Sequence, residues 1–203
     1  PVGSITLALQ PPRTVTLLFG EHTALGNDIY AKLPDSPQIF ILRDDIARLL
    51  NQSIEAYRSR DVWTFEPFRV VEMVVESPVS SYRMEQHDDR WRLVKPVEDV
   101  VDNAEASMLA SRVRNLRSER LISDAPKPEE LSGFGFDAPH VRVTLTFQDG
   151  RTKSLLVGNP TKEDSAQRYA QSSDEPAVHG VLQERLDQWL RPAQEFRSRS
   201  GLD

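Results

Sequence analysis

The sequence predicts an α+β protein, built mainly from antiparallel sheet with a few helices packed on one face, in which one half-unit occurs twice. The first observation is an internal repeat: ITLALQPPRTVTLLFG at residues 5–20 returns as VTLTFQDGRTKSLLVG at residues 143–158. The offset is 138 positions without a gap, and eight of the sixteen positions are identical. The second is the alternation of apolar and polar residues in short runs, which is typical of half-buried strands. The third is a single long helical pattern that begins with a capping box.

The repeat continues beyond these strands, with slips of one or two residues where loops tolerate them. The later matches pair Tyr30-Ala31 with Tyr169-Ala170, Ile41-Leu42 with Val181-Leu182, and Tyr57–Arg60 with Phe196–Arg199. The chain is therefore expected to start in the middle of a repeat unit. Residues 1–66 are interpreted as the C-terminal half of a first unit and residues 67–203 as a complete second unit. On this interpretation the chain is a fragment, and a targeting or anchoring segment would lie upstream.

The first half-unit is expected to contain four strands and a short closing helix. These elements are Ser4–Gln10, Arg13–Gly20, Asp28–Leu33, Gln38–Leu42 and the helix Asp44–Gln52. Within the first strand Ile5, Leu7 and Leu9 point to one side, as a sheet with one buried face requires. The second copy turns at Asp149-Gly150, a strong hairpin signal, and closes with a helix over Gln183–Leu190. The first copy has proline at the same turn, so its geometry must differ.

The middle of the chain is expected to form three strands followed by the longest helix. The strands are Phe68–Glu76, Ser81–His87 and Arg90–Lys95, and the helix runs from Asn103 to Leu121. Asp102 is the expected N-cap, and Glu105 completes the capping box. Apolar residues at helical spacing predict the buried face of this helix. Three serines and an arginine predict its solvent-exposed face. The buried set is Met108, Leu109, Val113 and Leu116, and the wet set is Ser107, Ser111, Arg114 and Ser118. The Pro- and Gly-rich stretch 124–139 is expected to loop over the surface, with one helical turn at Glu129–Leu131.

Composition describes an ordinary globular protein large enough to bury a core. Hydrophobic residues make up 38% and charged residues 28% of the chain, and the formal net charge is −6. No basic stripe is evident, so nucleic acid is not expected as a partner. The chain has no cysteine, which excludes disulfides, thiolate metal sites and a cysteine nucleophile. No apolar run is long enough to span a bilayer.

The polar residues match no catalytic or metal motif, so no enzymatic activity, metal or cofactor is expected. The four histidines share no ligand spacing, the glycine-containing loops lack the lysine of a phosphate loop, and no serine lies in a nucleophile elbow. Adjacent acidic pairs fall at turns or helix starts, where carboxylates stabilise the helix dipole. Tyr30 and Tyr169 are interpreted as strand-packing residues.

One polar signature occurs twice: an aromatic residue followed by Arg-Ser-Arg. It places Arg58 and Arg60 in the first copy and Arg197 and Arg199 in the second. These arginines are the candidate binding residues, since guanidinium groups hold anions through charge-assisted hydrogen bonds. A structural role is favoured, because constraints of a shared fold repeat in both copies whereas active sites usually do not.

Several short motifs together resemble the bacterial domain-of-unknown-function family 4340 (DUF 4340). They are Trp91-Arg92-Leu93 with Lys95-Pro96, Gly135-Phe136-Asp137-Ala138-Pro139, the paired strands that end at Leu155-Leu156-Val157-Gly158, Tyr169-Ala170, and the segment Tyr57–Asp61. Phe136 stands where the family usually has leucine, and Gln171 where it has arginine. The resemblance implies no assigned enzymatic activity and no catalytic residues. It also implies a membrane-tethered protein outside the cytoplasm, associated with an auxiliary component of ABC transporters of the gliding-motility type.

Taken together, these observations favour a non-enzymatic interaction or scaffold module of a bacterial envelope-associated protein, an accessory to an ABC transporter on the resemblance above. The expected partner is a protein of the cell envelope, and membrane contact would be made only through a segment outside this sequence. The expected location is extracytoplasmic. The alternative left open is a ligand-binding domain, for a saccharide or a peptide, with its site between the two copies.

Overall fold

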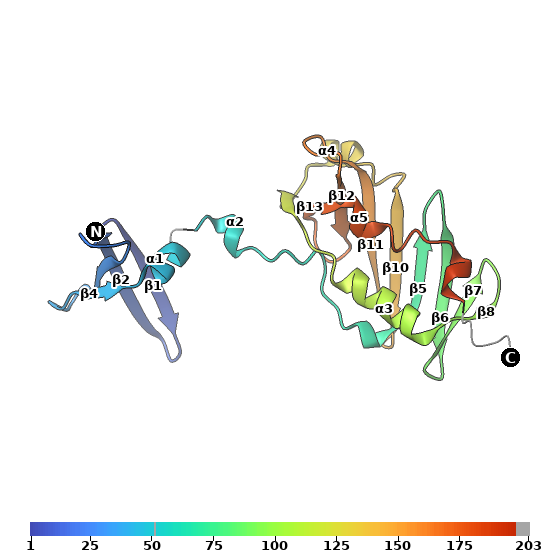
Figure 1. Cartoon of the computed structure of the whole chain (residues 1–203), viewed down its shortest axis with the longest axis horizontal. Helices are drawn as coiled ribbons and strands as arrows, with labels where there is room; N and C mark the ends of the chain where they lie inside the picture. Colours follow the sequence, from blue (N-terminus) through green and yellow to red (C-terminus); the bar gives the residue numbers. More distant parts are fainter. Residues whose placement is uncertain (51, 198–203) are drawn as a thin grey trace. The chain divides into compact units, whose positions relative to one another are not determined.

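A computed structural model describes residues 1–50 and 52–197, and it divides into two compact units (Figure 1). The first unit is Pro1–Ser59 and the second is Arg60–Asp203. The fold is α+β with antiparallel sheet, as the sequence predicts. No helix in the described part of the chain is long and apolar enough to cross a bilayer.

The first unit is a four-stranded antiparallel meander followed by two short helices. Its strands pair in the order β1-β2-β3-β4. The elements are β1 (Gly3–Leu9), β2 (Arg13–His22), β3 (Ile29–Lys32), β4 (Phe40–Leu42), α1 (Asp44–Leu50) and α2 (Ile54–Tyr57). The helix expected over Asp44–Gln52 is thus present as α1, and its position Asn51 lies outside the described residues. A small apolar cluster of Phe19, Ile29 and Ala31 forms the core of this unit.

The second unit is one nine-stranded antiparallel sheet in the order β8-β7-β6-β5-β10-β11-β12-β13-β9. Its N-terminal part contains a 3-10 turn (Pro67–Arg69), β5 (Val70–Glu76), β6 (Ser81–His87), β7 (Arg90–Lys95), β8 (Asp99–Val100), α3 (Asn103–Arg114), β9 (Arg120–Ser123) and α4 (Pro128–Phe134). Its C-terminal part contains β10 (Val141–Phe147), β11 (Thr152–Pro160), β12 (Gln167–Ser172), β13 (Val178–Leu182), α5 (Gln183–Leu186) and a 3-10 turn (Ala193–Phe196). The central pairing of β5 with β10 joins the two parts into one sheet.

The strand order confirms that the repeat is structural. Ile5 pairs with Leu17 in β1–β2, and Val143 pairs with Leu155 in β10–β11, so both partners are shifted by the same 138 positions. The irregularity in β2–β3 lies between Phe19 and His22, and that in β11–β12 lies between Val157 and Pro160, again 138 positions later. The two meanders therefore share their pairing as well as their strand order.

The register corrects the expected match at the fourth strand. Ile41 pairs with Tyr30, and Gly180 pairs with Tyr169, so Ile41 corresponds to Gly180 and not to Val181. One inserted residue therefore separates the copies after the second strand, and the offset remains 139 positions through the fourth. The match made on residue type was one residue out of register at this strand. Val181-Leu182 resembles Ile41-Leu42 more closely than Gly180-Val181 does.

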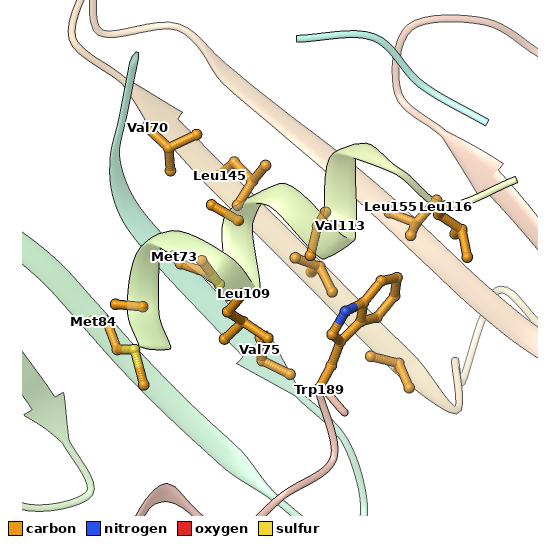
Figure 2. Packing of buried hydrophobic residues seen from close by; sticks show 14 of the residues in the cluster. Val70, Met73, Val75, Met84, Leu109, Val113, Leu116, Leu145, Leu155 and Trp189 are labelled. Carbon is orange, nitrogen blue, oxygen red and sulfur yellow. The ribbon is translucent and has the colours of Figure 1, made fainter. Parts of the chain in front are cut away.

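Helix α3 covers the main core of the second unit. Ala106, Leu109, Ala110 and Val113 are buried at helical spacing. Figure 2 shows Leu109 and Val113 directed toward the side chains of the sheet, with Trp189 beside them. The N-cap is confirmed, since Asp102 accepts hydrogen bonds from the backbone of Ala104 and Glu105.

The expected helix over Asn103–Leu121 is wrong in its length and partly wrong in its buried face. It ends at Arg114, and Arg120–Ser123 forms strand β9, which pairs with β13. Met108 is 44% exposed, whereas Ser118 is buried and donates its hydroxyl to the Arg120 carbonyl at 2.8 Å. Residues 120–123 form backbone pairs with β13, and this pairing outweighs the local preference for helix.

A second, smaller core lies around α4. Phe136, Tyr169 and Val178 are buried there, with Ile122, Phe134 and Leu156 packed against them. The expected helical turn at Glu129–Leu131 lies within this seven-residue helix. The expected helix Gln183–Leu190 is shorter, because α5 ends at Leu186.

Candidate interaction surface of the first unit

The repeated arginines do not gather into one described site. The Nε of Arg197 donates to Asp99 of β8 in the same unit. A hydrogen bond from the Val100 backbone and the one from Arg197 lower the pKa of Asp99. Arg58 follows α2 and is engaged in an interaction, and the carbonyl of Arg60 accepts a hydrogen bond from the Ser118 backbone at 2.6 Å. Arg199 lies outside the described residues.

Several charged side chains on the face of the second sheet that α3 does not cover pair with one another. Arg83 lies 2.7 Å from Glu72 and 2.6 Å from Glu85, and the Thr146 hydroxyl donates to Glu72 at 2.7 Å. His87 lies 3.1 Å from Glu85. Each of these carboxylates already has cationic or hydroxyl partners, which is typical of a surface ion-pair network. Within residues 1–50 and 52–197, no group of three or more His, Asp or Glu side chains could hold a metal ion.

His179 is the most buried of the four histidines. Its Nε2 lies 3.8 Å from Glu175, and neither ring nitrogen has a hydrogen-bond partner in the part of the chain that the structure describes. Burial lowers the pKa of His179, and it also lowers the pKa of His140, where Arg168 adds to the effect. Both imidazoles are therefore favoured in their neutral form.

We expect the second unit to lose stability as pH falls from about 7 to 5, and His179 to contribute to that loss. The folded pKa is lowered, so the unfolded chain binds more protons once pH falls below the ordinary histidine value of about 6.5. The contribution of a neutral His179 is therefore fully present above that pH and is lost below it. Melting temperatures of the original chain and of His179→Leu, followed by tryptophan emission, should diverge in slope over this range. His87→Gln at an exposed site is the control, and equal slopes for all three chains would contradict the assignment.

The feature that distinguishes the two copies is the burial of corresponding apolar side chains. Leu7 is 50% exposed while Leu145 is fully buried, and Tyr57 is 59% exposed while Phe196 is fully buried. We define the open surface of the first unit by the exposed apolar residues on the two faces of its sheet and beside them: Val2, Leu7, Leu9, Tyr30, Ile39, Phe40 and Ile41. Isolated exposed apolar residues are common, but a set concentrated in one small unit is typical of an interaction site.

The edges of the two meanders differ in the same way. In the second unit β10 pairs with β5 at one edge, and β13 pairs with β9 at the other. In the first unit the corresponding strands β1 and β4 have only their inner neighbours as partners among the described residues. The outer edge of β1 is therefore a row of backbone donors and acceptors ready to pair with another strand. Sequence reasoning missed this surface, although the repeat itself was the signal that could have revealed it.

Comparison with protein families gives one description for the whole chain. A family model described as domain of unknown function (DUF4340) matches residues 1–128 and again residues 91–203. Comparison with curated proteins finds no match. Comparison with solved structures also finds none.

Proposed function

The chain belongs to the DUF4340 family, and on that premise we propose that it is a non-enzymatic interaction or scaffold module. The observation that supports this proposal most directly is the open surface of the first unit, because Leu145, Phe147, Tyr169 and Val178, the counterparts of four of its residues, are buried. A protein partner would bury the exposed side chains of the first unit by apolar packing, as their counterparts are buried in the second unit. The polar clusters of the second unit support the proposal as well, because their charged groups neutralise one another.

The setting belongs to the same proposal. We place the module in a bacterial envelope-associated protein outside the cytoplasm, where it would bind another envelope protein beside an ABC transporter. This part rests on the family resemblance alone. Fractionation of cells that produce the natural protein tests it, because the proposal requires the protein in the envelope fraction.

The mode of binding proposed for the β1 edge is strand addition. In the second unit β5 lies against β10 with Val75 opposite Val143 and Met73 opposite Leu145. The repeat transfers this register to β1, so an added strand would place an apolar residue opposite Ile5 and another opposite Leu7. Backbone hydrogen bonds would then supply affinity, and the alternate side chains specificity.

We expect a peptide with the sequence of residues 69–77, RVVEMVVES, to bind this edge. The measurement is hydrogen exchange of the β1 amides in the whole chain, which should slow by about tenfold or more when the peptide pairs with the strand. A peptide with proline at position 74 should have no effect, because proline lacks the backbone donor. Within the chain, Leu7→Asp should weaken binding, while Ser4→Arg should not, since Arg142 occupies the corresponding position in β10.

Two results would contradict the proposed function. One is unchanged hydrogen exchange of the β1 amides at the highest peptide concentration that leaves the other residues unaffected. The other is turnover in a broad hydrolase screen that disappears when a single pocket residue is changed. The second result would make the module an enzyme and would be independent of the peptide experiment.

A further inference from the structure

The small core around α4 in the second unit has an open counterpart in the first unit. In the second unit Leu156, Tyr169 and Val178 are covered by aromatic side chains from α4 and the residues after it. The ring of Phe134 lies 4.7 Å from that of Tyr169 and 5.8 Å from that of Phe136, measured between centroids. These rings leave Tyr169 only 4% exposed.

The first unit repeats the three covered positions as Leu18, Tyr30 and Ile39. Together with Gly20 they line a cavity of about 300 Å³ whose walls are mainly apolar. Tyr30 is 41% exposed and Ile39 is 67% exposed, although Tyr169 and Val178 at the same places are buried. The site thus keeps the leucine and the tyrosine and has isoleucine in place of valine, and in the described part of the chain no ring from a segment like α4 is inserted among them.

Glycine at the rim supplies an independent argument. A Cβ at Gly158 would lie 1.9 Å from the carbonyl oxygen of Phe134, so the end of α4 can approach β11 only because that residue is glycine. Gly20 stands at the same position of the repeat, yet a Cβ there would meet nothing nearer than Tyr30 at 3.5 Å. The first unit therefore keeps the clearance for a closely approaching backbone.

We infer that this cavity binds a polypeptide segment of the pattern of residues 128–137, PEELSGFGFD, supplied by another half-unit of the same family. The segment would place its two phenylalanines between Leu18, Tyr30 and Ile39 and its helix end against Gly20. Lys32 also lines the cavity, and the segment carries three carboxylates, so the charges are complementary as well. The inference rests on the proposed function, because it names the partner of one part of the open surface.

The test uses the whole chain and a synthetic peptide of residues 127–138, KPEELSGFGFDA. We expect saturable NMR shifts at Leu18, Gly20, Tyr30 and Ile39. Peptides with Phe134→Ala or Phe136→Ala should bind at least about tenfold more weakly, because buried aromatic anchors carry most of the affinity of such contacts. An unchanged affinity for both altered peptides would overturn the inference.

The chain offers matched variants. Gly20→Ala should weaken peptide binding at least about tenfold while leaving the melting temperature unchanged, since the added methyl blocks only the approaching backbone. Gly3→Ala, in the same unit but not among the residues that line the cavity, should bind like the original chain. Tyr30→Ala provides a second disruption of the cavity. Full binding by both Gly20→Ala and Tyr30→Ala would place the peptide elsewhere and reject the site.

The remaining outcomes separate this inference from the proposed function. If the peptide of residues 127–138 fails to bind while the strand peptide of residues 69–77 binds β1, the inference is wrong and the interaction module stands. If both fail, both are wrong. If sedimentation shows a dimer that Gly20→Ala dissociates, a second copy of the chain supplies the segment, and the inference stands with the chain itself as the family partner.

Discussion

Replacing Val113 by aspartate is expected to unfold the second unit. Val113 is fully buried on the face of α3 that packs against the sheet, and its carbonyl accepts a hydrogen bond from the buried Trp63 indole at 2.9 Å. An unpaired carboxylate there would cost several kcal/mol, about 4 or more, against a total stability of roughly 5–15 kcal/mol. Tryptophan emission measures the result without interference from the first unit, because Trp63, Trp91 and Trp189 all belong to the second.

Met108→Asp is the matched control for that experiment. Met108 lies in the same helix and is exposed, so aspartate there should change the free energy of unfolding by less than about 1 kcal/mol. A melting curve of Val113→Asp that matches the original chain would contradict the packing of α3. A large effect of Met108→Asp would instead restore the buried face that the sequence predicts.

Gly158→Ala is expected to destabilise the second unit by about 3 kcal/mol. The added methyl would meet the Phe134 carbonyl, which is backbone and cannot rotate away, so α4 must shift from β11. The shift would also loosen the rings around Tyr169. Chemical denaturation followed by tryptophan emission gives the free energy of unfolding, and hydrogen exchange should locate the loosening at α4.

Gly20→Ala is the control at the same position of the repeat. Nothing lies closer than 3.5 Å to the added carbon in the first unit, so the melting temperature of that unit should stay that of the original chain. It is followed by circular dichroism, because all three tryptophans belong to the second unit. Equal destabilisation by both substitutions would mean that the glycine serves the sheet itself and not the approach of a neighbouring segment. Two neutral substitutions would show that α4 does not hold the close approach to β11.

Much of the sheet could be predicted from residue patterns. Alternation located the strands, and the repeat required equal strand order in both meanders. The strand β9 could not be predicted, because Arg120–Ser123 has no alternating pattern of its own and becomes a strand only through pairing with β13. The sequence did not predict the whole buried face of α3, because Ala106 and Ala110 are small residues and alanine occurs both in protein interiors and on protein surfaces. Met108 was misplaced for the opposite reason, since an apolar residue in a helix need not face the core.

The open surface could not be predicted from the strands alone. Alternation in β1 indicates that one face is apolar, and it does not tell whether anything covers that face. Leu7 and Leu145 are the same residue type in the same pattern, yet their surroundings differ because β5 and α3 cover the meander of the second unit. The retained glycine pair Gly20 and Gly158 was visible in the repeat, but its meaning depends on the position of the Phe134 carbonyl.

The pairing of β5 with β10 also has a consequence for the speed of folding. Val74 and Thr144 are direct neighbours in the sheet although some seventy positions separate them in the chain. Closing a loop of that length precedes any gain from the contact, so sheets with distant partners fold slowly. Every strand pair of the first unit joins neighbours in sequence. We therefore expect the first meander to form early, with its apolar side chains exposed, before β5 pairs with β10 in the second unit.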